Sequence, residues 1–230
     1  QSTITYLLAV SIELSRGENE GADRRGSSGR LAMPRCFSLE VRPSPCWCIP
    51  MIDTSGHHIV YGALTDYLTG EVLPDTDDER IRQELSAMMV EEKQYRRDEL
   101  LPRLSIDTFF ARCYVRSVID LTVRLENRQI MIIRYGPGSL VSRERAAVAA
   151  ARVLNPAYVI PLAVVTNGRE AELLDTSTGK ILEYGLHSIP DRSTALAMTA
   201  NMPILPPPQG KKREQEMRIL NAFDVERCCI

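Results

Sequence analysis

Residues 117–138 have the sequence S-V-I-D-L-T-V-R-L-E-N-R-Q-I-M-I-I-R-Y-G-P-G, in which two β-rich runs flank a short turn. The first run, residues 118–125, alternates between apolar and polar side chains, as a half-buried strand does. The apolar residues expected to share one face are Ile119, Leu121 and Val123. The second run, residues 129–135, is almost wholly apolar, which is typical of a strand buried on both faces. It ends at Gly-Pro-Gly, where a strand cannot continue. The stretch therefore predicts a central pair of adjacent strands.

Helical patterns flank this strand pair. The carboxylates of residues 75–78 favour a helix start, and apolar side chains recur at helical spacing from there to about Lys93. Residues 139–154 are rich in alanine, which predicts a helix that lies close against a sheet. Its small residues expected to face that sheet are Ala146, Ala147 and Ala150. Asn155-Pro156 ends this second helix.

More strands are predicted towards the C-terminus. Residues 158–166 have the composition of a buried strand despite Pro161, Asn-Gly turns the chain, and residues 172–175 return as the next strand. Residues 105–115 fit either a helix end or a first strand, and periodicity does not choose between them. The order of helix, strand pair, helix and strand predicts an α/β fold with a mixed sheet.

The composition changes at both ends of this central part. Residues 1–50 combine a Gly/Ser/Arg/Glu-rich segment with an aperiodic proline-rich one, which predicts a disordered or non-native extension before a natural start at Met51. A short helix is expected to open at residues 191–193. The expected organisation is an extension at 1–50, a hairpin-like clasp at 51–78, the main domain at 79–200, a proline-rich linker at 201–210 and a C-terminal helix at 211–230.

The overall composition narrows the class of protein. The chain has 230 residues and a net charge of −2, so no global basicity indicates nucleic acid, although a local basic patch stays open. No run approaches the roughly 18 apolar residues that would span a membrane. The six cysteines lack zinc-ligand spacing, and the three histidines do not complete a ligand set. Reduced thiols in a cytoplasmic protein are therefore expected.

Several short motifs together resemble a known family. Residues 79–182 resemble the N-terminal nuclease-type domain of the R (restriction) subunits of type I restriction enzymes and of small stand-alone bacterial relatives. The motifs are R-I-R-Q at 80–83, I-D-L-T-V at 119–123, Y-G-P-G at 135–138, V-V-T-N-G at 164–168 and E-L-L-D at 172–175. The T-N-G turn before a strand ending in Asp is the most specific of them. The resemblance implies a restriction-endonuclease-like fold, a mixed sheet flanked by helices.

The resemblance also implies where a metal site would lie. The family's PD-(D/E)xK motif places an Asp on one strand and Glu-x-Lys on the next, just before a Pro-Gly turn. The two carboxylates hold Mg²⁺, and the lysine orients or activates a water against the phosphodiester. Asp120 matches the Asp, but Ile133 falls at the Glu position and Tyr135 at the Lys position. Isoleucine cannot bind Mg²⁺ and tyrosine is a poor substitute for an ammonium group, so Asp120 is a remnant of a degenerate motif.

These losses predict a pseudo-nuclease that binds DNA or a partner protein, such as another subunit of a restriction or DNA-processing system. No cofactor is expected in that case. The alternative is an active Mg²⁺-dependent endodeoxyribonuclease with relocated groups, for which the candidates are Glu84, Glu126, Glu144 and Arg134. A third hypothesis is a purely structural module. The residues able to contact nucleic-acid phosphates are Arg124, Arg128, Arg134, Arg143 and Arg145.

Overall fold

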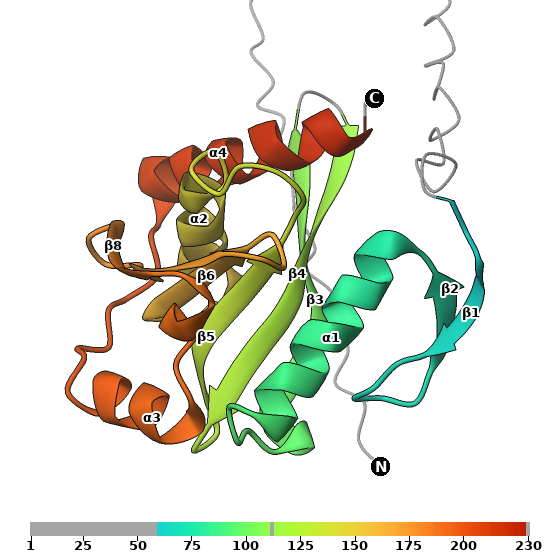
Figure 1. Ribbon diagram of the computed structural model, residues 1–230. Coiled ribbons are helices and arrows are strands. Elements are labelled where there is room, and N and C mark those ends of the chain that lie inside the picture. Colours follow the sequence, from blue (N-terminus) through green and yellow to red (C-terminus); the bar gives the residue numbers. More distant parts are fainter. Residues whose placement is uncertain (1–58, 111–112, 229–230) are drawn as a thin grey trace, which may run out of the picture. The chain divides into compact units, whose positions relative to one another are not determined.

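A six-stranded mixed sheet forms the centre of the structure, a computed structural model that describes residues 59–110 and 113–228 (Figure 1). The sheet has the strand order β3-β4-β5-β6-β7-β8. Its strands are β3 (Leu100–Phe110), β4 (Cys113–Leu125), β5 (Arg128–Tyr135), β6 (Leu162–Thr166), β7 (Ala171–Asp175) and β8 (Lys180–Tyr184). β5 and β6 run parallel, and the other neighbouring pairs run antiparallel. The predicted α/β fold with a mixed sheet is confirmed.

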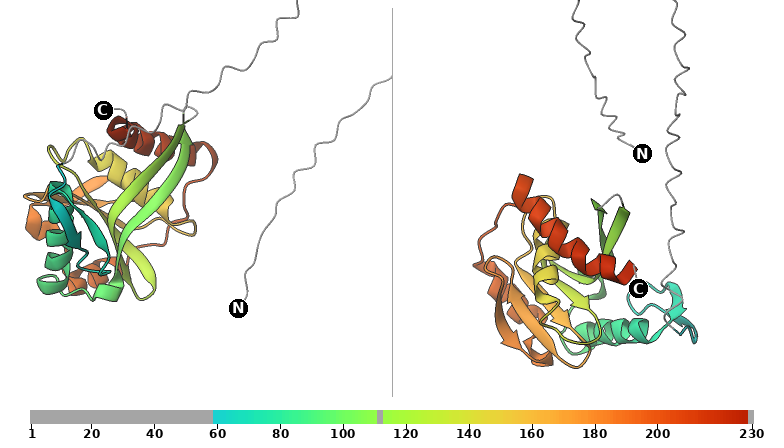
Figure 2. Two further views of the ribbon diagram at one scale, coloured as in Figure 1. Left: turned by 90° about the vertical axis from the view of Figure 1, so that its right-hand side faces the viewer. Right: turned by 90° about the horizontal axis from the view of Figure 1, so that it is seen from above.

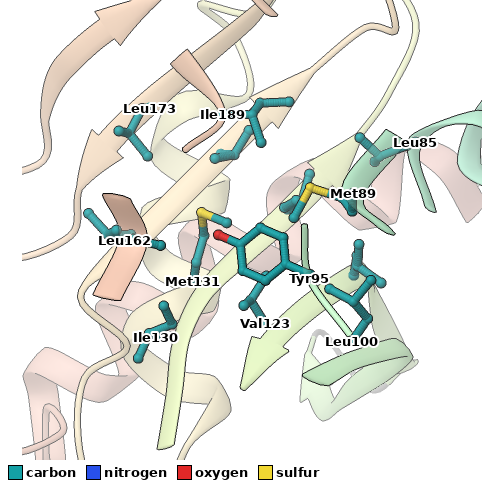
Figure 3. Packing of buried hydrophobic residues seen from close by; sticks show 14 of the residues in the cluster. Leu85, Met89, Tyr95, Leu100, Val123, Ile130, Met131, Leu162, Leu173 and Ile189 are labelled. Carbon is teal, nitrogen blue, oxygen red and sulfur yellow. The ribbon is translucent and has the colours of Figure 1, made fainter. Parts of the chain in front are cut away.

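Helices cover both faces of this sheet. They are α1 (Asp77–Glu91), α2 (Glu144–Leu154), α3 (Arg192–Ala200) and α4 (Gly210–Cys228), with short 3₁₀ turns η2 (Arg97–Glu99) and η3 (Leu186–Ser188). α1 and α3 contribute to one buried apolar cluster, in which Met89 and Tyr95 lie against Val123 and Met131 (Figure 3). α2 and α4 contribute to a second cluster on the other face (Figure 2). The arrangement agrees with a restriction-endonuclease-like fold.

The central strand pair forms as predicted. β4 and β5 pair antiparallel, with Leu121 opposite Ile133, around a turn in which Glu126 and Asn127 both have positive φ. Such a two-residue turn matches the right-handed twist of the strands that it joins. The ambiguous residues 105–115 belong to the hairpin of β3 and β4 as far as the structure describes them, so the strand interpretation is the correct one.

One feature of β4 differs from the prediction. Ile119 packs in the cluster beneath α2, whereas Leu121 and Val123 pack in the cluster beneath α1, so these three residues do not share a face. The neighbouring strand β3 is irregular at the same level, where Arg103 has a φ of 54°. The pairing of β3 with β4 keeps one register on both sides of this level, and β3 changes faces there too, between Leu100 and Leu104. Asp120 lies at the point where β4 changes faces.

The alanine-rich helix is α2, and its packing explains its composition. Ala147 and Ala150 pack in one cluster with residues of β5 and β6, as predicted, so the helix can lie close to these strands. Ala146 is buried too, but it is not part of that cluster. The helix begins at Glu144 rather than 139, because residues 140–143 form a turn instead. β6 likewise begins only after Pro161, which has no N–H group for a strand ladder.

The remaining described segments are the N-terminal hairpin and the two C-terminal helices. Residues 59–78 of the expected clasp contain the hairpin of β1 (Gly62–Thr65) and β2 (Val72–Asp75). α3 opens at Asp191, whose side chain caps it, and α4 buries Leu220 against the sheet side of α2. The expected extension at 1–50 lies outside the described residues. In the part of the chain that the structure describes, we find no helix long and apolar enough to cross a membrane.

Candidate functional site

The carboxylate of Asp120 already has donors for both of its oxygen atoms. The Nε atom of Arg82, in α1, donates to Oδ1 over 2.5 Å. The backbone N–H of Tyr135, in β5, donates to Oδ2 over 2.7 Å. The Asp120 side chain is only 7% exposed. The remnant of the motif therefore joins a helix and the neighbouring strand instead of facing an open site.

Arg82 is surrounded by further negative charge. Its Nη1 atom donates to Glu79 Oε2 over 3.3 Å, and its guanidinium carbon lies 5.5 Å from the centroid of the Tyr135 ring. Burial works to lower the pKa of Arg82, but the charges of Asp120, Glu79 and Asp78 outweigh it, and the pKa is raised above its ordinary value. Arg82 is therefore charged at every physiological pH.

Tyr135 stands at the position of the family's lysine. Its hydroxyl donates to Asp78 Oδ1 over 3.1 Å, and the residue is almost fully buried. Burial, followed by the nearby charge of Asp78, raises the pKa of Tyr135 to about 12. The phenol therefore stays neutral at physiological pH and supplies no positive charge to a phosphodiester.

Ile133 stands at the position of the second carboxylate. It is fully buried in the apolar cluster beneath α1, together with Leu85 and Met89 of that helix. This surrounding supplies neither a ligand for a cation nor water to solvate one. Ile133 is part of the hydrophobic core.

The residues present do not fit the magnesium ion that the resemblance implies. Among the described residues, no three Asp, Glu, His or Cys side chains are grouped so that they could hold a metal ion. The candidates for relocated ligands lie elsewhere. Glu84 is two residues from Arg82 and exposed on the far side of α1, and Glu126 lies in the β4–β5 turn, about 20 Å along the strand from Asp120. Glu144 begins α2 on the opposite face of the sheet.

The candidate phosphate-binding arginines fall into two groups. Arg124 and Arg128 lie near the β4–β5 turn. Arg124 donates from Nη2 to the carbonyl oxygen of Asp98 over 3.2 Å, and the guanidinium of Arg128 lies 5.3 Å from the centroid of the Tyr158 ring. Arg124 can reach solvent at this end of the sheet, whereas Nε and Nη2 of Arg128 are buried and have no hydrogen-bond partner among the described residues.

The other group lies at the opposite end of β5, about 20 Å away. Arg134 is buried in the strand. Arg143 donates from Nη2 to the carbonyl oxygen of Pro137 over 2.7 Å, and Arg145 is exposed in the first turn of α2. The structure therefore does not bring the five arginines into one patch.

Comparison with known proteins agrees with the geometry. Residues 77–190 match the family model described as type I restriction enzyme R protein N terminus. This domain belongs to that family. No curated protein and no solved structure matches the chain. The R-protein N-terminal domain here thus covers α1 and the whole of the six-stranded sheet.

Sequence reasoning missed the role of Arg82. The residue is part of the R-I-R-Q motif, but the sequence analysis gave it no partner. It precedes Leu85 by three residues and Met89 by seven, so all three lie on the face of the helix that meets the sheet. A charged residue on that face indicates a partner of opposite charge, and this spacing could have identified it.

A second buried charge also escaped the sequence analysis. Glu172, in β7, is only 5% exposed, and its Oε2 atom has no hydrogen-bond partner among the described residues. Burial, followed by the charges of Glu144 and Glu170, raises the pKa of Glu172. It lies on the α2 side of the sheet, away from Asp120.

Proposed function

We propose that this R-protein N-terminal domain does not cleave DNA and acts instead as a nuclease-fold module that binds DNA. One observation carries the loss of cleavage. Each oxygen of Asp120 accepts a hydrogen bond, one from Arg82 and one from the Tyr135 N–H, and the residue that the resemblance places at the second carboxylate is the buried Ile133. A Mg²⁺ ion beside Asp120 would therefore find no second carboxylate to bind it from the other side.

The size of the expected loss follows from the chemistry. A metal-dependent nuclease stabilises the charge that develops on the phosphodiester, and removal of a single electrostatic group commonly costs about 10²–10³ in rate. Two such groups are replaced, at Ile133 and Tyr135. We therefore expect residual hydrolysis to fall by a factor of about 10⁴–10⁶ relative to an intact motif, if the two losses multiply.

Incubation of the purified chain with DNA and Mg²⁺ or Mn²⁺ tests this proposal. We expect no cleavage. Cleavage that a chelator stops, and that disappears in Asp120→Ala, would contradict it and favour the active endonuclease with relocated ligands.

DNA is the ligand that the family suggests, and the small number of accessible arginines limits how it can bind: Arg145 is exposed, whereas Arg124 and Arg128 are half-buried. Two or three phosphate contacts predict a modest salt dependence, with log K falling against log salt with a slope of about −2 to −3. Replacement of Arg124, Arg128 or Arg145 by alanine should reduce that slope by about 1 for each residue that contacts a phosphate. Lys180→Ala, in β8, is the control for Arg124 and Arg128 only, because residues 178 and 179 line the same pocket as Arg145. Binding that none of the three variants weakens would contradict this mode.

A partner protein is the second candidate, and the edge of the sheet favours it. β8 is an edge strand whose side chains are mostly exposed, including Leu182 at 47% and Tyr184 at 61%. Exposed apolar side chains on an edge strand are typical of a surface to which another strand can add. Absence of salt-dependent DNA binding, with co-purification of a second subunit that Tyr184→Lys abolishes, would favour this role.

A further inference from the structure

We infer that Arg82 is the built-in cation of this domain, with its guanidinium group replacing the metal as the counter-ion of Asp120. The inference rests on the proposed loss of cleavage and states what the remnant aspartate does instead. It assigns to R-I-R-Q a role in fixing α1 on the sheet.

The need for a counter-ion follows from burial. A carboxylate as buried as Asp120 is costly without compensation, because it has lost most of its contact with water. The Tyr135 N–H supplies one hydrogen bond but no charge. Arg82 supplies the charge, and its short bond to Asp120 connects residues 38 positions apart in sequence. Removal of one member of such a pair leaves the other charged and buried.

The geometry suits a guanidinium group better than a metal ion. Asp120 accepts from Nε and Glu79 from Nη1, so the two carboxylates meet different edges of one planar cation. Tyr135 lies over the same group. A spherical metal ion needs several ligand atoms at a common short distance, and the described part of the chain groups no three suitable side chains. A lysine would offer a point charge instead of this directional fork.

The position of Arg82 within α1 explains why this contact matters to the fold. The following turns of α1 are held by apolar packing of Leu85 and Met89. The first turns are polar, and Gln83 binds the clasp by accepting a hydrogen bond from the Tyr67 N–H over 2.6 Å. Arg82 therefore joins this polar half of α1 to the sheet, together with the hydrogen bond from Tyr135 to Asp78. The clasp has its own ion pair with the sheet, between Asp66 and Arg103 of β3.

Thermal unfolding of the full chain tests the inference, with and without millimolar Mn²⁺. We expect Arg82→Met to lower Tm by roughly 5–12 °C, the range for breaking a partly buried ion pair in a protein of this size. Arg80→Met is the matched control: it lies on the same helix but pairs with Asp75 near the surface, and its Tm should fall by less than about 4 °C. Mn²⁺ should shift the Tm of neither the wild type nor the control.

Two further variants keep the test decisive. Asp120→Asn in the Arg82→Met background should recover part of the lost Tm, because it removes the uncompensated charge. Arg82→Lys keeps the charge, and its Tm should fall between the wild type and Arg82→Met. If Arg82→Met does not fold, Arg82→Lys and the wild-type Mn²⁺ titration still decide the matter.

Three results would overturn the inference. The first is a rise in the Tm of the wild type with Mn²⁺ that Asp120→Asn abolishes. The second is an equal fall in Tm for Arg82→Met and Arg80→Met. The third is an unchanged Tm for Arg82→Lys, together with no recovery of Tm when Asp120→Asn is added to Arg82→Met. The proposed function fails separately. Metal-dependent DNA cleavage would contradict it, whereas metal binding without cleavage would overturn only the role of Arg82.

Discussion

Replacement of Glu172 by glutamine should stabilise the protein at neutral pH. The carboxylate is buried between β7 and α2, and its Oε2 atom has no hydrogen-bond partner among the described residues. The charged groups that face it are Glu144, in the first turn of α2, and Glu170, just before β7. Both repel a second negative charge. The opposing residue of β8, Tyr184, brings no cation.

The expected gain follows from the cost of this arrangement. An unsatisfied buried polar atom costs about 1–3 kcal/mol. Glutamine keeps the shape and removes the charge, but its amide still needs partners, so we expect a gain of about 1 kcal/mol in the free energy of unfolding at pH 7.

The contribution of Glu172 to the free energy of unfolding changes with pH in the opposite direction to that of a paired carboxylate. Because the pKa of Glu172 is raised above its ordinary value of 4.5, the folded state disfavours ionisation. The loss of stability caused by the buried charge is absent when the pH is below the ordinary pKa of 4.5. It grows as the pH rises towards the raised pKa of Glu172 and is complete above that pKa. The advantage of Glu172→Gln should therefore vanish in acid.

Urea unfolding at a series of pH values measures this difference directly. Glu170→Gln is the matched control, since it removes an exposed neighbouring carboxylate and should change stability by less than about 0.5 kcal/mol. A glutamine variant that is less stable than the wild type at pH 7 would refute the reasoning. So would a gain that persists unchanged at pH 4.

Three further substitutions test other contacts by the same urea assay. Asp66→Asn should cost about 2 kcal/mol at neutral pH, because burial is outweighed by the Arg103 hydrogen bond and two backbone N–H donors and the pKa of Asp66 falls to about 2. That stability is complete above pH 3.8 and is lost as the pH falls through about 2, so the gap to the wild type should close in acid. Gly168→Ala should cost about 1–3 kcal/mol, because φ is +84° and the new Cβ would lie 2.9 Å from Ile81 Cγ2. Leu220→Ala should cost about 2–5 kcal/mol if α4 is an integral part of the core, whereas a neutral result would mean that the helix docks only loosely.

Sequence patterns predicted the central strands because burial there is uniform. The apolar run of β5 is buried on both faces, and the alanines of α2 are buried against it, so composition and environment agree. β8 was not predicted, since four of its five residues are exposed and K-I-L-E-Y has no period that marks a strand. Its strand conformation comes from pairing with β7, which local sequence does not encode.

The candidate site was only partly predictable for a related reason. The motif identified Asp120, Ile133 and Tyr135, but not which cation compensates the aspartate. The chain contains 28 lysine and arginine residues, and Arg82 reaches Asp120 only because α1 crosses that point of the sheet. The change of face in β4 was equally hidden, because the apolar and polar residues of I-D-L-T-V alternate without a break.

The presence of Asp120 is therefore no evidence for catalysis. In an active site of this fold, the aspartate has to leave an oxygen available for a metal ion. Here one oxygen accepts from the β5 backbone and the other from Arg82, so loss of the side chain would leave a buried N–H and a guanidinium group without their partner. These two hydrogen bonds give Asp120 a structural role that does not depend on catalysis.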